Sequence, residues 1–274
     1  MHSLAQFTVP AIADISDAPL TARLQHLLDN KTKPLGSLGR IESLARRIGL
    51  VLGSDAPELH EPQLVVYAGD HGLAARGVSA YPSDVTWQMV ENFLAGGAAV
   101  SVLARQNGIG LTVVDCGVRH EFAPRPGLLI RKLALGTSDA LDTSAMTDSQ
   151  CEQALANGVA LVQALPGNAL LLGEMGIGNT SAASLLLSRL SSLDIADCTG
   201  AGTGLDAPAV QRKIEVLRAV LARIIHNRTQ QKHRQRTLGE ILLALAPSQG
   251  RGGGQSHAKR DKRGDGVAFE SVRF

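Results

Sequence analysis

The feature that most constrains this fold is an apolar run that ends in glycine and polar residues and that occurs three times. Residues 62–72 read PQLVVYAGDHG, and their apolar stretch is continuous rather than alternating. Such a stretch is typical of a strand buried on both faces of a parallel sheet. Residues 111–118 (LTVVDCGV) and 168–176 (NALLLGEMG) follow the same pattern. The sequence therefore predicts parallel strands that are each followed by a polar turn.

Helical segments lie between and around these predicted strands. Apolar residues recur at helical spacing in residues 12–30, 41–53, 83–108, 147–165 and 206–227. Thr147 and Gly53 stand where a helix is expected to begin and to end. Strands that alternate with helices predict an α/β fold, here a Rossmann-like parallel sheet flanked by helices.

Three regions follow from this pattern. We expect a small helical subdomain at residues 1–60, an incomplete nucleotide-binding α/β domain at 61–245, and a disordered or aberrant basic, glycine-rich tail at 246–274. Ligands of parallel α/β sheets bind beyond the carboxyl ends of the strands. The three polar turns should therefore meet in one crevice.

The charge of the chain is divided unevenly. Residues 1–222 hold 16 basic and 21 acidic residues, whereas residues 223–274 hold 11 basic and 4 acidic ones. A basic segment can bind nucleic acid, but residues 223–236 contain no interleaved aromatic residue, so a solvated helix end is favoured. The last 25 residues hold six glycines and no apolar period, which is typical of a disordered tail.

Other classes of protein are excluded by what the sequence lacks. No apolar run approaches the ~18 residues of a membrane span, and the first residues do not form a secretory signal pattern. Cys116, Cys151 and Cys198 form no close pair, which argues against a disulfide framework and a four-cysteine metal site. We expect a cytoplasmic protein without a metal, a cofactor, a nucleic-acid partner or a membrane partner.

The clearest chemical motif is the glycine-rich segment 173–181, GEMGIGNTS. Glycines after a strand allow the backbone to wrap an anion, and free amides at the start of the next helix point toward it. The side chains of Asn179, Thr180 and Ser181 can add hydrogen bonds. The segment matches neither the dinucleotide pattern GxGxxG nor the Walker pattern. Phosphate binding and a tight turn with a helix cap are equally compatible with it.

Glu174 and two further motifs each have a functional and a structural interpretation. Glu174 follows an apolar strand. In the functional interpretation, partial burial raises the pKa of its carboxyl group and suits it to act as a general base. In the structural interpretation, the carboxylate accepts backbone hydrogen bonds and orders the loop. Residues 199–204 (TGAGTG) are a second candidate phosphate loop or a flexible linker. Lys213 lies in the next helix, where its ammonium group can either reach a phosphate held by these loops or simply be solvated. For Asp70 and His71, a polar pair lining the crevice is favoured over a metal site.

Together and in order, these motifs resemble the nicotinate-nucleotide–dimethylbenzimidazole phosphoribosyltransferase family. The matching segments are KPLGSLGRIE (33–42), AGDHG (68–72), TWQMVENFLAGGAAVSVLAR (86–105), VVDCGV (113–118), GLLIRKLALGTSD (127–139), AMT (145–147), GEMGIGNTSAA (173–183) and GAGTGLD (200–206). The resemblance implies transfer of the phosphoribosyl group of nicotinate mononucleotide to 5,6-dimethylbenzimidazole. The products are α-ribazole 5′-phosphate, a precursor of the lower ligand of cobalamin, and nicotinate.

The resemblance also assigns residues to the site. It implies nucleotide binding by Gly176, Gly178, Asn179, Thr180, Ser181, Gly202 and Lys213. It places Glu174 in the active site in a supporting role, and it places Ser79, Tyr81 and Gln88 in the segment that forms the benzimidazole pocket. It also implies a homodimer.

The resemblance ends near residue 245. Family members continue with a Gly-Gly-Phe-Glu-like helix start, an Asp-Gly-Phe strand end, a His-x-Ser-x-Glu loop and an Arg-Leu-Gly-Glu-Gly motif, whose glutamate is the general base. None of these occurs in residues 246–274, so we expect a truncated or frameshifted tail. Loss of a general base commonly costs ~10²–10⁴-fold in rate, so little or no transferase activity is expected of the chain as written.

Two alternatives to an active transferase stay open. The first is an impaired or inactive member of the family that still binds nicotinate mononucleotide. The second is a general phosphate-binding α/β enzyme, such as a diphosphate-dependent phosphoribosyltransferase. That group would show an acidic pair and a Thr-Gly-rich loop after an apolar strand, and we find no such motif. The missing C-terminal motifs also leave the homodimer open.

Overall fold

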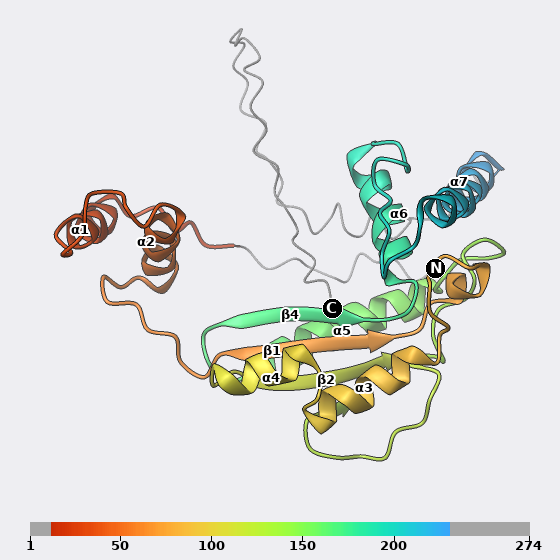
Figure 1. Ribbon diagram of the computed structural model, residues 1–274, viewed down its shortest axis with the longest axis horizontal. Coiled ribbons are helices and arrows are strands. Elements are labelled where there is room, and N and C mark those ends of the chain that lie inside the picture. Colours follow the sequence, from red (N-terminus) through yellow and green to blue (C-terminus); the bar gives the residue numbers. More distant parts are fainter. Residues whose placement is uncertain (1–11, 231–274) are drawn as a thin grey trace, which may run out of the picture.

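The computed structural model describes residues 12–230 of the 274-residue chain. The strands of this part are β1 (Gln63–Gly69), β2 (Gly110–Gly117), β3 (Leu128–Ile130) and β4 (Leu170–Met175). The helices are α1 (Ala18–Asp29), α2 (Arg40–Leu52), α3 (Val85–Ala95), α4 (Ala99–Gln106), α5 (Asp148–Ala164), α6 (Asn179–Ser191) and α7 (Ala207–Gln230), with a short 3-10 helix, η2 (Gly72–Arg76). Figure 1 shows the strands as one sheet with helices on both sides of it.

The strands form a parallel sheet in the order β3-β2-β1-β4. The chain moves from β1 outward to β2 and β3, and it then returns to place β4 on the other side of β1. This reversal creates a switch point between β1 and β4, which is where doubly wound sheets bind ligands. The registers Gly69↔Gly117 and Ala68↔Met175 bring the carboxyl ends of three strands to one edge. The predicted α/β fold and the common edge are confirmed.

Helices cover both faces of the central strands, which explains why β1 is apolar on both. Val66 of β1 packs with Phe93 of α3 in one core cluster. Its neighbour Val65 packs with Leu161 of α5 in another. Figure 1 shows α3 and α4 in front of the sheet and α5 behind it. The side chains of successive strand residues thus enter separate cores on opposite faces.

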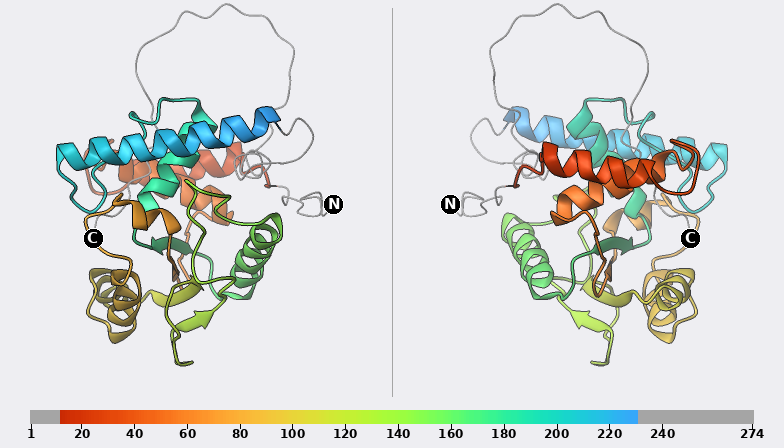
Figure 2. Two further views of the ribbon diagram at one scale, coloured as in Figure 1. Left: turned by 90° about the vertical axis from the view of Figure 1, so that its right-hand side faces the viewer. Right: turned by 90° about the vertical axis from the view of Figure 1, so that its left-hand side faces the viewer.

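Helices α6 and α7 lie beyond the carboxyl ends of the strands (Figure 1). A third core cluster joins α7 to the segment that follows β1, because Leu217 and Val220 pack with Leu73 and Val78. Leu217 and Val220 are fully buried. Figure 2 shows α7 as a long helix above this end of the sheet. The cluster fixes α7 in place next to the candidate crevice.

The first two helices stand apart from the sheet in Figure 1. The loop between them is held by an ion pair of 2.8 Å between Lys33 Nζ and Glu42 Oε1, and the same oxygen accepts a hydrogen bond from the Leu38 amide. The two helices thus come before the sheet in the sequence and lie to one side of it in the structure. The division of the chain at residues 60 and 245 stays a prediction, and residues 231–274 lie outside the described part.

Two features of the fold differ from expectation. Strand β3 and helix η2 were not predicted, because they span only three and five residues and leave little periodic signal. The predicted burial of the β4 segment on both faces is wrong for the described residues. Leu171 is 41 % exposed and Leu172 is 69 % exposed. The cause is position, since β4 pairs only with β1 and forms the edge of the described sheet.

Among residues 12–230, no helix combines the length and the apolar character that crossing a membrane requires.

Candidate functional site

The candidate site lies between the turns that follow β1 and β4. A Cβ atom at Gly176, after β4, would collide with the carbonyl oxygen of Gly69, the last residue of β1. It would also lie 3.1 Å from the ring of His71, two residues further along the chain. The two turns are therefore in direct contact, and only glycine permits this approach. The predicted meeting of the polar turns occurs at the switch point of the sheet.

The segment after β4, residues 176–180, is here called the glycine loop. Gly178 adopts the left-handed conformation (φ +92°) that favours glycine, and α6 begins at the next residue. The amide of Ile177 donates a hydrogen bond of 3.1 Å to Thr86 Oγ1, and Thr86 is fully buried in α3. This bond holds the glycine loop against the first turn of α3. The start of α6 carries a partial positive charge that attracts anions.

Polar side chains gather at the start of α6. The Oδ1 atom of Asn179 accepts a hydrogen bond of 2.7 Å from the Thr180 amide. Ser181 is fully buried, and its hydroxyl oxygen has no hydrogen-bond partner among the residues that the structure describes. Buried polar atoms are normally paired. The Ser181 hydroxyl is thus an unused hydrogen-bonding group in the first turn of the helix.

The main electrostatic feature of the site is a buried cation. Lys213 on α7 is 1 % exposed, and its Nζ donates to Thr180 Oγ1 at 2.8 Å and to the carbonyl oxygen of Gly200 at 3.4 Å. Burial lowers the pKa of this amine, and no carboxylate in the described part of the chain counteracts that effect. A buried charge without a counter-charge is costly. The interpretation of Lys213 as a solvated surface residue is therefore wrong.

The second glycine-rich segment, residues 199–204, packs beside this lysine. Gly202 has a φ of +57°, and a Cβ atom there would lie 3.1 Å from Thr180 Oγ1 and 3.5 Å from Lys213 Nζ. Thr203 Oγ1 lies 3.3 Å from Ser79 Oγ, in the segment before α3. These contacts join residues 199–204 to the rest of the site. The segment is not a detached linker.

Glu174 lies beside the glycine loop but is not buried. Its carboxylate accepts a hydrogen bond from the side-chain amide of Asn179, and the residue as a whole is exposed. The predicted partial burial of Glu174 is wrong because β4 forms the edge of the described sheet. The hydrogen bond supports the other interpretation, in which this carboxylate orders the loop.

The predicted benzimidazole residues occupy different surroundings. Ser79 contacts the second glycine-rich segment, as described above, and its Oγ lies 3.4 Å from the Tyr81 amide nitrogen. Tyr81 is 52 % exposed, and Gln88 is exposed on α3. The structure thus brings Ser79 to the glycine-rich segments, while Tyr81 and Gln88 lie at the surface nearby in sequence.

Two contact residues were missed from the sequence. Thr86 holds the amide of Ile177, and Thr203 meets Ser79 across 124 positions of the chain. A single threonine in a helix or loop leaves no periodic or spacing signal, so only the folded chain reveals these contacts. Trp87, which follows Thr86 in α3, stacks on His120, with ring centroids 4.7 Å apart.

The described side chains of the site include groups suited to an anion, namely the Lys213 ammonium and the free Ser181 hydroxyl. No group of three or more His, Cys, Asp or Glu side chains within residues 12–230 is arranged to hold a metal ion. Burial raises the pKa of Cys116, at the end of β2, to about 11. This thiol is therefore protonated at neutral pH and is a poor nucleophile.

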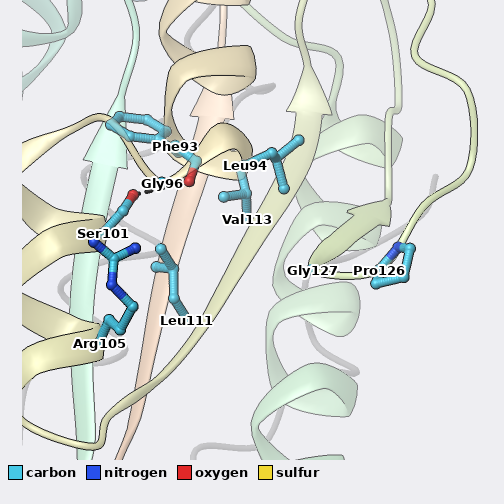
Figure 3. Close-up of a pocket in the computed structure, with 9 residues that line it drawn as sticks. All are labelled: Phe93, Leu94, Gly96, Ser101, Arg105, Leu111, Val113, Pro126 and Gly127. Atoms are coloured by element: carbon cyan, nitrogen blue, oxygen red, sulfur yellow. Dashed lines mark hydrogen bonds between the residues drawn. The ribbon is translucent and has the colours of Figure 1, made fainter.

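A separate cleft of about 210 Å³ lies between α3, α4 and β2 (Figure 3). It is lined by Phe93, Leu94, Gly96, Ser101, Arg105, Leu111, Val113, Pro126 and Gly127. Arg105 is the sole charged residue among these. None of the predicted site residues lines this cleft.

The fold and the crevice define a doubly wound α/β protein. The phosphoribosyltransferase family matches residues 14–245, and the chain belongs to this family. It is 71 % identical over 215 residues to the nicotinate-nucleotide–dimethylbenzimidazole phosphoribosyltransferase of Variovorax paradoxus, covering 78 % of this chain and 62 % of the relative. It is 54 % identical over 212 residues to the enzyme of the same name from Dechloromonas aromatica, covering 76 % and 61 %.

A solved structure agrees with these relatives. The crystal structure of CobT from Thermus thermophilus matches with a TM-score of 0.68 and 40 % identity, over 75 % of this chain and 62 % of that chain. The resemblance inferred from the motifs is confirmed. The chain spans about 62 % of the length of the curated relatives that it matches.

Proposed function

We propose that this chain transfers the phosphoribosyl group of nicotinate mononucleotide to 5,6-dimethylbenzimidazole, giving α-ribazole 5′-phosphate and nicotinate. The bond between the anomeric carbon and the pyridine nitrogen breaks, and its electron pair stays with nicotinate. A ring nitrogen of the azole forms the new bond from the opposite face, and the N–H proton of the azole passes to water. The names of the relatives support this reaction.

The observation that carries the proposal is the buried ammonium group of Lys213. It lies between Thr180 at the start of α6 and Gly200 in the second glycine-rich segment, with hydrogen bonds only to neutral oxygens in the described residues. A phosphate bound there would supply the missing negative charge, and amides at the start of α6 would donate to its oxygens. We assign this end of the site to the 5′-phosphate.

The remaining assignments follow from this placement. Gly176, Gly178 and Gly202 allow the backbone to approach the nucleotide closely, and Asn179, Thr180 and Ser181 supply polar groups. Glu174 supports the loop through Asn179. Ser79, Tyr81 and Gln88 contribute to the benzimidazole side, which begins where Thr86 of α3 contacts Ile177.

The experiment is a turnover assay with the full chain, nicotinate mononucleotide and 5,6-dimethylbenzimidazole. Chromatography should detect α-ribazole 5′-phosphate and nicotinate in equal amounts, formed at a low rate because residues 246–274 contain none of the family's C-terminal motifs. Nucleotide binding without either product would favour the alternative of an impaired family member. If the nucleotide neither binds nor reacts, both interpretations fail.

A homodimer and a cytoplasmic location belong to the same proposal. The helix pair α1 and α2 exposes apolar side chains, including Ile41 (63 %) and Leu44 (57 %), which are suited to contact with a second copy. Light scattering of the purified chain tests this assembly. The three cysteines are free, as expected in a reducing compartment.

A further inference from the structure

His71 lies in the switch-point crevice and has no role in the site as described so far. It follows β1 directly, and its ring atoms Cδ2 and Nε2 both lie 3.1 Å from the position of a Cβ atom at Gly176. A Cβ atom at Gly178 would lie 3.4 Å from the Cβ of His71. The imidazole therefore packs against the first half of the glycine loop.

The imidazole of His71 is only partly exposed and yet unpaired. No hydrogen bond joins its ring to any other residue in the range 12–230. Burial lowers the pKa of this histidine, and the opposing effect of Asp70 is smaller, so the ring is neutral at pH 7. A neutral imidazole has one N–H donor and one acceptor lone pair. Polar groups with so little exposure are normally paired, and the described residues supply no partner for this ring.

The position of His71 determines which part of the substrates it meets. Lys213 and Thr180 mark the phosphate end of the glycine loop. Gly176 and His71 lie at its other end, next to the Ile177 amide that α3 holds. In a phosphoribosyl group the anomeric carbon lies away from the 5′-phosphate. With the phosphate placed beside Lys213 as proposed above, His71 would lie on the side of the anomeric carbon, where the azole attacks.

We propose that His71 recognises the azole acceptor, because its lone pair accepts a hydrogen bond from the azole N–H. This inference rests on the proposed function. The bond leaves the other azole nitrogen, which has its own lone pair, free to face the anomeric carbon. His71 then determines specificity, since an azole with a free N–H is favoured over an N-alkylated one.

The test compares two azoles by isothermal titration calorimetry on the full chain. 5,6-Dimethylbenzimidazole has an N–H group, and 1,5,6-trimethylbenzimidazole carries a methyl group in its place. The wild-type chain should bind the first about tenfold more tightly, as expected for one buried hydrogen bond. His71→Phe should reduce the ratio to about one, and His71→Gln, which keeps an acceptor oxygen, should retain part of it. His60→Phe, at an exposed histidine before β1, should keep the wild-type ratio.

A second measurement needs no variant. The ring nitrogens of His71, observed by ¹⁵N NMR, should shift on addition of 5,6-dimethylbenzimidazole and much less with the trimethyl analogue. A wild-type ratio near one, a tenfold ratio kept in His71→Phe, or equal shifts with both azoles would overturn the proposal. Each titration is run with and without nicotinate mononucleotide. Failure of the nucleotide to bind then counts against the proposed function, while the azole ratio still decides the role of His71.

Discussion

Replacement of the buried lysine by methionine should weaken nucleotide binding without unfolding the protein. In Lys213→Met the new side chain has a similar length but no charge. A hydrogen bond to a charged group contributes about 1.5–3 kcal/mol, so the affinity for nicotinate mononucleotide should fall about 10- to 150-fold. Calorimetric titration measures this loss.

The same variant should be at least as stable as the wild type in the absence of ligand. Wild-type Lys213 is buried with no carboxylate partner in the described structure, so the substitution removes an unfavourable charge. In urea unfolding, the free energy of unfolding of Lys213→Met should be equal to or higher than that of the wild type. It should in no case be lower by more than about 1 kcal/mol, the value of a typical hydrogen bond.

The stability difference should also depend on pH. Burial lowers the pKa of Lys213 below its ordinary value of 10.5, so the folded chain binds this proton less tightly than the unfolded chain. The unfolded state therefore holds more protons in the window below 10.5, and the wild type gains stability as the pH rises through it. Lys213→Met lacks this dependence. Its advantage should be largest at neutral pH and should disappear as the pH passes 10.5.

Lys132→Met is the matched control. The Nζ atom of Lys132 lies 3.3 Å from Oδ2 of the fully buried Asp115. Loss of this partner leaves a buried carboxylate without its counter-charge and should cost about 3–5 kcal/mol of stability, with little effect on nucleotide affinity of the folded fraction. If Lys213→Met instead loses stability like the control, or binds the nucleotide as tightly as the wild type, the reasoning about the buried cation is refuted.

Three further substitutions test the contacts around the glycine loop. Thr86→Val removes the hydrogen-bond acceptor of the buried Ile177 amide, so the free energy of unfolding should fall by about 1–3 kcal/mol and hydrogen exchange at that amide should become faster. Thr86→Ser keeps the hydroxyl and should restore both properties. Unchanged exchange in Thr86→Val would contradict the assignment. Gly176→Ala should destabilise by about 1–3 kcal/mol because its Cβ meets the Gly69 carbonyl, whereas Gly200→Ala, with open space around it, should change stability by less than about 0.5 kcal/mol. Glu174→Ala removes the hydrogen bond to Asn179 and should weaken nucleotide binding about threefold. Glu174→Gln keeps an acceptor oxygen and should bind the nucleotide like the wild type. Equal affinities of the two variants would show that this hydrogen bond is unimportant.

The parts of the fold that the sequence predicts are those determined by local signals. The apolar runs of β1 and β2 define buried strands, and Thr147 forms the predicted helix start as a capping box with Gln150. Gly53 adopts the left-handed conformation at the end of α2, as its position predicts. These features depend on a few neighbouring residues, so the sequence alone reveals them.

The parts that escaped prediction depend on distant contacts. Lys213 is buried because α7 packs on the segment after β1, which no local pattern of α7 shows. Glu174 is exposed because β4 lies at the edge of the described sheet, although its apolar run resembles that of β1. The contact of Thr86 with Ile177 joins residues 91 positions apart. The motif predicted the candidate site, while the burial of its charged groups is visible only in the folded chain.

The most direct test of the account is whether the glycine loop and Lys213 bind the 5′-phosphate. Calorimetry of the full chain with nicotinate mononucleotide and with nicotinic acid riboside, which lacks only the phosphate, measures this contribution. The account predicts that the nucleotide binds about 100-fold more tightly than the riboside, and that the difference largely vanishes in Lys213→Met. Equal affinities of the wild-type chain for the two compounds would contradict it.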